Sequence, residues 1–307
     1  MKSNLILFLK GMAMGAADVI PGVSGGTIAF ISGIYERLIS ALSAVDVSLI
    51  STFKNEGFAA VWRKIDGFFL LVLFAGIGSS ILSLAKGLSF LLENHPIPVW
   101  SFFFGLIIAS VLVVYRQLKT RKALLLIPFV LGIAFAWWIT MLVPAQSSNS
   151  LPFVFFSGAI AICAMILPGI SGSFILLILG KYQYILESLH QLRIDVILVF
   201  MAGCGIGLLS FVRLVKWLFA KYHDLSIAVL GGFMIGSLNK VWPWKITLES
   251  ILLKDKLIPS VQQNVSPWAY ESLSGIPAEL PLSLACAAIG LGLILVLEYA
   301  GNRNRLA

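Results

Sequence analysis

Charged residues are scarce in this 307-residue sequence: only 12% are Asp, Glu, Lys or Arg, whereas 59% are hydrophobic. A soluble domain usually carries about 25% charged residues, so water cannot be the main solvent of this chain. Apolar stretches of about 20 residues, long enough to cross the hydrocarbon core of a bilayer, recur along the sequence. We therefore expect residues 1–307 to form a single polytopic membrane domain of the all-α class.

Cysteine and histidine are also rare, which limits the chemistry available to the protein. The three cysteines stand singly in apolar runs, without the C-x-x-C spacing of a metal or redox pair: Cys163, Cys204 and Cys286. We expect no metal and no cofactor. The net charge is +8, but the basic residues gather in short loops and form no face with interleaved aromatic residues, which argues against nucleic acid as a partner.

One segment of the chain occurs twice. Gly11–Leu42 matches Gly158–Leu189 without a gap, with roughly a third of the positions identical. The matched residues mostly have special backbone roles: Pro21 and Pro168, Gly22 and Gly169, Ser24 and Ser171, Gly25 and Gly172, Gly33 and Gly180, Tyr35 and Tyr182. Further along, the matched residues are Gly76 and Gly203, Gly78 and Gly205, Gly105 and Gly232, Ser110 and Ser237. We expect repeat 1 in residues 1–142 and repeat 2 in residues 151–299.

The apolar run near the N-terminus resembles a signal peptide. Cleavage beside Ala16 and Ala17 would cut through the repeated segment, so we expect the run to be retained.

Each copy of the repeat carries Pro-Gly in the middle of an apolar stretch whose arms are short for a full crossing. Proline removes a donor and glycine permits a sharp turn, which predicts re-entrant helical hairpins at about 5–42 and 151–190. Three transmembrane spans follow each hairpin, at roughly 67–92, 98–117, 122–142, 194–220, 225–243 and 279–299. A hairpin returns to its own side and three crossings are odd, so we expect two inverted repeats.

The most basic short loop sets the predicted topology. It contains Arg116, Lys119, Arg121 and Lys122, and the positive-inside rule places it in the cytoplasm. Both termini are then cytoplasmic, and the uncharged link at 143–151 lies outside. The outer segment 244–278 carries Lys245, Lys254 and Lys256 against that rule and is the weakest part of the topology.

The hairpin tips are the candidate binding site. Inverted repeats with broken helices place backbone N–H groups and helix N-termini near the bilayer midplane, where they favour an anion such as phosphate. The candidate substrate-binding residues are Pro21, Gly22, Ser24, Gly25, Gly26, Thr27, Gly169, Ser171, Gly172 and Ser173. In the alternative interpretation, the glycines only permit tight packing and the two serines only cap the second arms.

Charged residues within the apolar segments are further candidates. Lys86 and Arg213 occupy equivalent repeat positions and either pass a phosphate to and from the midplane or extend to the nearer interface. Asp18 has no acidic counterpart and either binds a coupling proton or cation or caps the neighbouring broken helix. Coupling or gating roles are open for Glu36 and Arg37, although pairing within each second arm is expected for them and for Lys181 and Glu187.

Two other functions are compatible with the hairpins. The G-x-S-G pattern at Ser24 and Ser171 is also found at intramembrane serine-hydrolase nucleophiles, but the three histidines fall at span ends, where no base reaches the tips: His95, His190 and His223. A small-anion or ion channel on the same hairpins is the second alternative. We expect no catalytic residue, and the sequence leaves the oligomeric state open, a homo-oligomer included.

The first hairpin motif is long enough to indicate a family. The sequence Ala17-Asp18-Val19-Ile20-Pro21-Gly22-Val23-Ser24-Gly25-Gly26-Thr27, echoed by Leu167-Pro168-Gly169-Ile170-Ser171-Gly172, resembles the bacterial undecaprenyl-phosphate transporter family called PopT, formerly a domain of unknown function. The resemblance implies a flippase of the bacterial inner membrane. Its partner is a polyprenyl-phosphate lipid, returned from the outer to the inner leaflet for carrier-lipid recycling in cell-wall synthesis.

Overall fold

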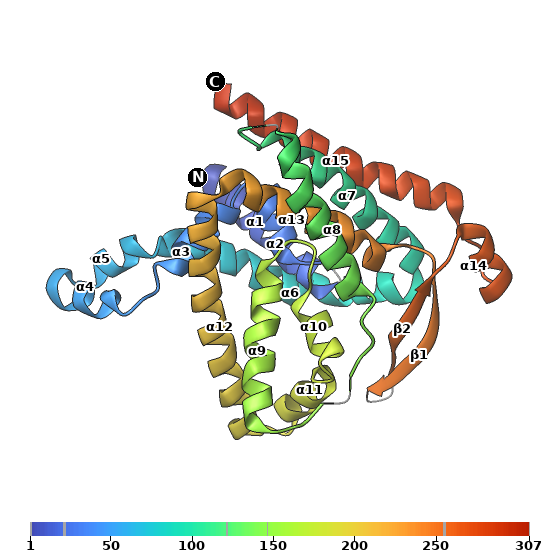
Figure 1. Cartoon of the computed structure of the whole chain (residues 1–307), viewed down its shortest axis with the longest axis horizontal. Helices are drawn as coiled ribbons and strands as arrows, with labels where there is room; N and C mark the ends of the chain where they lie inside the picture. Colours follow the sequence, from blue (N-terminus) through green and yellow to red (C-terminus); the bar gives the residue numbers. More distant parts are fainter. Residues whose placement is uncertain (1, 21–22, 121, 146, 254–255, 307) are drawn as a thin grey trace.

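The chain is predominantly α-helical (Figure 1). The computed structural model describes residues 2–20, 23–120, 122–145, 147–253 and 256–306. Five helical segments among these residues are long and apolar enough to cross a membrane: α6 (Gly67–Asn94), α7 (Pro96–Arg116), η1 (Ala123–Leu125) with α8 (Leu126–Thr140), α12 (Ile194–Lys221) and α13 (His223–Val241). They match five of the six predicted spans. The sixth lies in α15 (Leu280–Leu306), whose described apolar part, Leu280–Val296, is shorter.

The chain breaks at both repeated motifs, as predicted. In the first half, α1 (Lys2–Val19) is followed by α2 (Gly25–Ile31) and α3 (Tyr35–Ser43), and in the second, α9 (Leu151–Ile166) is followed by α10 (Gly172–Ile178) and α11 (Tyr182–His190). The helices α2 and α10 have seven residues each, and α3 and α11 have nine each. Because α2 packs back on α1 and α10 on α9, each broken segment is a helical hairpin.

The second break shows why a helix cannot continue through this motif. Leu167 has an extended backbone (ψ 130°), the conformation that a following proline favours. Gly169 has φ +88°, in the left-handed region where a side chain is strained. The Pro-Gly pair therefore stops α9 and turns the chain back.

The two halves share the same pattern of helix packing. The first helix of each half lies along the next long helix of the same half, α1 on α6 and α9 on α12. The last long helix of each half packs on the other half, α8 on α13 and α15 on α7. The opposite orientation of the halves relative to a bilayer, and the repeat boundaries, stay predictions.

Matched glycines account for these contacts. A Cβ at Gly76 would collide with the Phe8 carbonyl, and one at Gly203 with the Phe155 carbonyl. The pair Gly105 and Gly232 similarly lets another helix approach, with carbonyls of Ala287 and Phe129 against the missing side chains. Small residues allow close backbone approach between membrane helices. The glycines that match between the two repeats are therefore sites of close helix packing.

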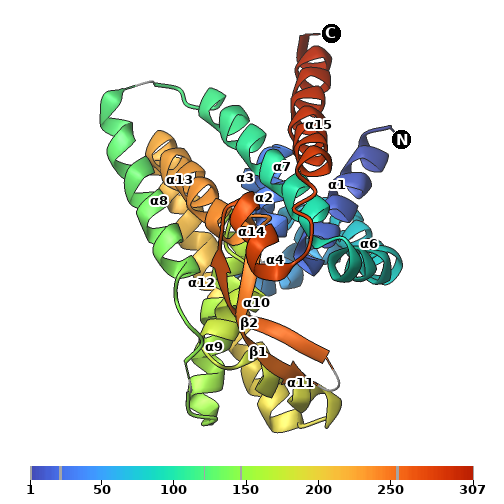
Figure 2. The same ribbon diagram turned by 90° about the vertical axis from the view of Figure 1, so that its right-hand side faces the viewer.

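Two segments between the spans were not predicted as secondary structure. Residues 44–66 contain α4 (Ser48–Glu56) and α5 (Phe58–Lys64), which project from the bundle at the left of Figure 1. The outer segment 244–278 forms an antiparallel pair, β1 (Lys245–Leu253) and β2 (Lys256–Asn264), followed by α14 (Pro267–Ser274). Figure 2 shows this pair on the side where α14 and the start of α15 lie.

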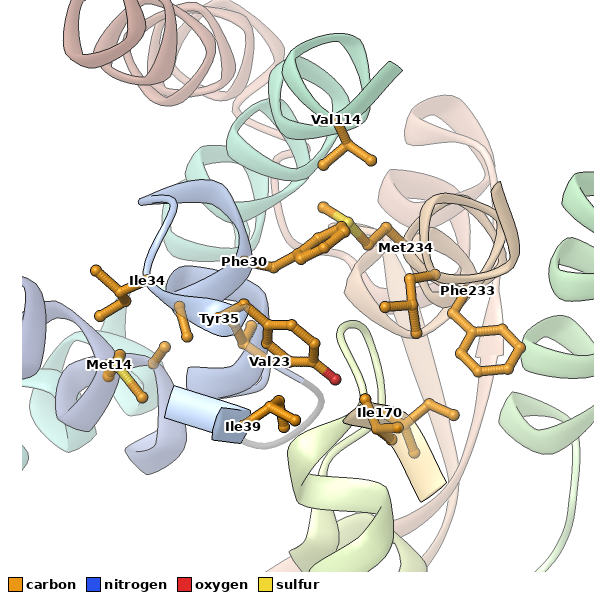
Figure 3. Close-up of a cluster of buried hydrophobic side chains, with 14 of the residues drawn as sticks. Met14, Val23, Phe30, Ile34, Tyr35, Ile39, Val114, Ile170, Phe233 and Met234 are labelled. Carbon is orange, nitrogen blue, oxygen red and sulfur yellow. The ribbon is translucent and has the colours of Figure 1, made fainter. Parts of the chain in front are cut away.

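The core lies where the two hairpins meet α7 and α13 (Figure 3). Val23 of the first hairpin and Ile170 of the second are 1% and 5% exposed, and Met234 of α13 is fully buried. By contrast, large hydrophobic side chains cover the outside of the long helices, with Leu82 86% exposed and Leu131 64%. An apolar exterior of this extent needs lipid to cover it, as the composition predicts.

Candidate functional site

The tips of the two hairpins touch each other directly. The Ser24 hydroxyl donates to the carbonyl oxygen of Met165 at 2.9 Å. In the other direction, the backbone N–H of Gly169 donates to Oγ1 of Thr27, also at 2.9 Å. The two candidate loops, 141 and 142 residues apart in these pairs, therefore form one junction.

Glycine makes this junction possible. A Cβ on Gly26 would lie 2.5 Å from the carbonyl oxygen of Ile166 in the other hairpin. One on Gly172 would lie 2.8 Å from the carbonyl oxygen of Ala161 in the first arm of its own hairpin. A real Cβ does not approach an oxygen so closely, so a larger residue at either position forces the backbones apart. The packing role proposed as an alternative for these glycines is real.

The serines do not cap their helices in the same way. Ser24 is extended and its Oγ accepts from the backbone N–H of Gly26 at 3.1 Å, the geometry of an N-cap. Ser171 makes no such bond to α10, and its hydroxyl instead pairs with that of Ser173 at 2.8 Å. Capping by both serines was one interpretation of the sequence; only Ser24 caps.

Asp18 lies beside the start of α2. Its Oδ1 accepts from the backbone N–H of Gly25 at 2.7 Å, so the carboxylate satisfies a donor at the first position of that helix. A Cβ on Gly25 would collide with this carboxylate. The structure thus places Asp18 within the junction, where the sequence alone left its contacts open.

The junction is closed in this conformation. The side chains of Ser24 and Thr27 are 0% and 1% exposed, and that of Ser171 is 6% exposed. Because their polar groups already bond to protein, a phosphate reaches Ser24 or Thr27 only after the hairpins separate. Pro21 and Gly22 of the candidate site, and Arg121 and Lys254 of the predicted topology, lie outside the described residues.

Lys86 and Arg213 stand apart from the buried junction, because both side chains are exposed on their helices. Arg213 donates to the carbonyl oxygen of Val45 at 3.1 Å. It lines a groove of about 450 Å³ with Asp46 and neighbouring apolar residues. The Asp46 pKa is lowered, first by its hydrogen bond to Ser48 and less by the charges of Lys64 and Arg213.

The predicted ion pairing between charged side chains of the same second arm, at α3 in the first hairpin and at α11 in the second, is wrong. Glu36 approaches Nε2 of His223 at 3.5 Å, and Arg37 bonds to Asp66 at 2.6 Å while its guanidinium lies over the Phe69 ring. Adjacent residues point about 100° apart on a helix, so Glu36 and Arg37 turn to different neighbours.

The corresponding pairing in the second hairpin is also wrong. The buried Lys181 bonds to the carbonyl oxygen of Ser147 and to Oδ1 of Asn149, while Glu187 pairs with Gln183. The link between the two halves therefore supplies the partners of Lys181. No periodicity within the helix could have indicated them.

The polar partners found for His223 are carboxylates and not a serine. The ring of His223 contacts Asp224 at 3.2 Å and Glu36 at 3.5 Å. Asp224 also accepts from the backbone N–H groups of Lys119 and Thr120, which ties the basic loop to the start of α13. Within the described residues, His, Cys, Asp and Glu side chains form no group of three or more that could hold a metal ion.

Three polar residues near the hairpins were missed as site candidates. The hydroxyl of Tyr35 is buried and, among the described residues, has no hydrogen-bond partner. In Figure 3 it points toward the side of the core where Ile170 lies. Lys240 and Lys245 flank the end of α13 next to the second hairpin. The sequence signal for Lys245 was its conflict with the positive-inside rule.

Long apolar helices surrounding two interlocked, broken hairpins are the architecture of a multi-pass membrane protein of the transporter type. The family described as undecaprenyl phosphate translocase-like matches residues 14–256, and the chain belongs to this family. The resemblance expected from the hairpin motif is thereby confirmed.

Two relatives carry the name polyprenyl-phosphate transporter. The relative from Vibrio cholerae serotype O1 is 48% identical over 295 residues, 96% of each chain. The relative from Staphylococcus aureus is 31% identical over 258 residues, 78% of this chain and 86% of the relative. No solved structure matches the chain significantly.

Proposed function

We propose that this protein transports a polyprenyl phosphate, undecaprenyl phosphate, across the bacterial inner membrane from the outer to the inner leaflet. The observation that carries the proposal is the junction of two similar hairpins, held by the Ser24 to Met165 and Gly169 to Thr27 hydrogen bonds. The names of the relatives supply the lipid class. The direction follows from the need to recycle a carrier lipid for cell-wall synthesis.

Separation of the hairpins frees the groups that a phosphate needs. The Ser24 hydroxyl, the Thr27 hydroxyl and the Gly169 N–H now bond across the junction, and all three become donors once the tips part. Exchanging one set of hydrogen bonds for another costs little, whereas leaving buried donors unpaired costs about 1–3 kcal/mol each. The headgroup thus replaces the junction bonds, and the prenyl chain stays in lipid.

Asp18 couples this exchange to a proton. Its carboxylate holds the Gly25 N–H at 2.7 Å and repels a phosphate at the same place. Protonation removes the negative charge of Asp18 and weakens its hydrogen bond to the Gly25 N–H. The Gly25 N–H can then donate to the headgroup, and the carboxyl group no longer repels the phosphate. This role deepens the proposed transport and is tested separately.

Reconstitution tests the proposal. The full chain is placed in proteoliposomes with undecaprenyl phosphate, and the loss of lipid from the outer leaflet is measured with time at several pH values. Ser24→Ala removes one donor to a charged group, so the rate should fall about tenfold. Ser171→Ala and Arg213→Ala should slow transport less, and Asp18→Asn should abolish the pH dependence.

Ser83→Ala is the matched control, because Ser83 is exposed and bonds only to the carbonyl of Ser79 in its own helix. Its transport should equal that of the native protein. Native rates in all four test variants would refute the assignment of the site, and a native protein that moves no polyprenyl phosphate would refute the function itself.

The proposed orientation places both termini in the cytoplasm. In a variant without native cysteines, Ser148→Cys lies in the outer link and Lys122→Cys in the basic loop. A membrane-impermeant maleimide should label Ser148→Cys in intact cells and Lys122→Cys only after permeabilisation. The reverse result would invert the topology.

A further inference from the structure

Two lysines lie close together at the end of α13 that is remote from the basic loop. Lys240 is in the last turn of α13, and the ammonium of Lys245, the first residue of β1, donates to the Lys240 carbonyl oxygen at 2.6 Å. Asp224, which binds the backbone of the basic loop, is 16 residues before Lys240. At 1.5 Å per residue this separation is about 24 Å, most of the thickness of a hydrocarbon core.

Aromatic rings surround both ammonium groups. The Lys245 Nζ lies 3.9 Å from the centroid of the Trp100 ring, and the Lys240 Nζ lies 4.5 Å from that of Phe174. Both lysines are only partly exposed. Among the described residues, neither ammonium has a carboxylate within 4.0 Å, because the four ion pairs found there involve other residues. The described part of the chain therefore places two lysines side by side in a largely apolar setting without a carboxylate partner.

The lysine pair lies next to the second hairpin. The Gly169 backbone packs so closely on α13 that a Cβ there would be 2.8 Å from the Phe233 carbonyl oxygen and 2.9 Å from Oγ of Ser237. Lys240 follows Ser237 by about one helical turn and contacts Phe174, the residue after Ser173. A group bound at Lys240 is thus one turn of α13 away from the junction.

We propose that Lys240 and Lys245 form the outer-leaflet binding site for a phosphomonoester headgroup, which they hold before it passes to the hairpin junction. The assignment rests on the proposed function for the identity of the lipid. A phosphate needs two cations of this kind because it carries up to two negative charges, and the Trp100 and Phe174 rings exclude water from the site.

The electrostatics of the pair favour an anionic guest. Burial, and secondarily the charge of Lys240, hold the pKa of Lys245 well below its usual value. The charge of Lys240 therefore disfavours the charged form of Lys245. A bound phosphate would have the opposite effect, since an opposite charge stabilises protonated lysine.

If Lys245 had only a structural role, its substitution would have a different effect from the loss of a binding residue. Its bond to the Lys240 carbonyl also anchors β1 to the end of α13. Nearby, Trp242 and Trp244 bond to the carbonyls of Val265 and Ala278, which flank α14. An anchor would affect thermal stability but not the affinity for an anion. Binding must therefore be measured beside stability.

The test uses the full chain in lipid nanodiscs and three probes: dodecyl phosphate, inorganic phosphate and the uncharged dodecanol. Binding is followed by the part of the tryptophan fluorescence change that Trp100→Phe removes. Dodecyl phosphate should bind most tightly and more weakly as salt increases. Inorganic phosphate that binds as tightly as dodecyl phosphate would overturn the assignment to a lipid headgroup.

The variants separate charge from shape. Lys240→Gln combined with Lys245→Gln should weaken dodecyl phosphate binding at least tenfold, whereas Lys240→Arg with Lys245→Arg should retain it. Lys54→Gln, an exposed lysine on α4, is the matched control. Unchanged affinity in the double glutamine variant would overturn the inference. If that variant fails to fold, binding by the native protein that is insensitive to salt would overturn it equally.

The outcomes also distinguish this inference from the proposed function. A native protein that binds dodecyl phosphate through the lysines but moves no undecaprenyl phosphate would refute transport and leave the site standing. A double glutamine variant that binds and transports at the native rate would refute the site and leave transport standing.

Discussion

Individual hydroxyl groups decide how firmly the two hairpins hold each other. Ser24 and Thr27 are fully used, since each bonds across the junction. Tyr35, buried in the same core, has no partner among the described residues. An unpaired buried hydroxyl destabilises the closed form. In the proposed transport, a phosphate between the separated tips would give the Tyr35 hydroxyl an acceptor.

Tyr35→Phe tests this interpretation of the core. Removing an unpaired buried hydroxyl should raise the free energy of unfolding by about 1 kcal/mol, measured as a higher melting temperature in detergent. Transport of undecaprenyl phosphate should fall several-fold, because the headgroup loses a donor. Tyr182→Phe, the half-buried counterpart in the second half, should change neither quantity. Higher stability with native transport would exclude a role for the hydroxyl.

The short second arms depend on glycine at their start. The helix α2 begins with Gly25 and Gly26, and Gly26 lies against the carbonyl oxygen of Ile166 at the end of α9. The crossing of the two hairpins is therefore set by the absence of a side chain. Small substitutions at this point act on the position of an entire element.

Gly26→Ala should lower stability by about 1–3 kcal/mol, because the added methyl group overpacks the crossing. It should also slow transport, since the hairpins no longer close in register. Gly78→Ala is the matched control: Gly78 is in α6, and a Cβ there meets nothing within 4 Å. Alanine at that helical position should stabilise by up to about 1 kcal/mol. Equal melting temperatures for the two variants would contradict the crossing described here.

At the scale of the whole molecule, the proposed transport requires the two hairpins to separate and rejoin at the junction. The last long helix of each half packs on the other half, so the halves are joined along their sides by α8 and α15 while their hairpins meet at the centre. Motion that opens the tips must therefore preserve these lateral contacts. Rocking of one half against the other satisfies this requirement.

A crosslink across the junction should stop transport. In a variant without native cysteines, Ser24→Cys and Met165→Cys place two thiols where a side chain and a backbone group now bond. Oxidation should abolish transport of undecaprenyl phosphate, and a reductant should restore it to the level of the unoxidised variant. Each single cysteine variant should be insensitive to the oxidant. Full transport by the crosslinked protein would show that the junction does not open.

Much of the architecture followed from composition and repetition alone. Five of the six predicted spans were found as helices of the expected length, and both breaks occur at the Pro-Gly motifs. These features are local, because a helix needs apolar residues to cross lipid and cannot continue through Pro-Gly. The β1–β2 pair was missed although its two strands are consecutive in the chain, because their polar residues, such as Lys245, Glu249 and Gln262, resemble those of a loop.

The sequence by itself determined that the chain spans a membrane, breaks twice and belongs to a lipid-phosphate transport family. Only the tertiary structure decided which groups meet. It paired Ser24 with Met165 and Glu36 with His223, and it brought Lys240 beside Phe174. It also left the Tyr35 hydroxyl without a hydrogen-bond partner among the residues that the structure describes. The physical reason is that helix breaks depend on neighbouring residues, whereas contacts between side chains depend on how helices far apart in the chain pack.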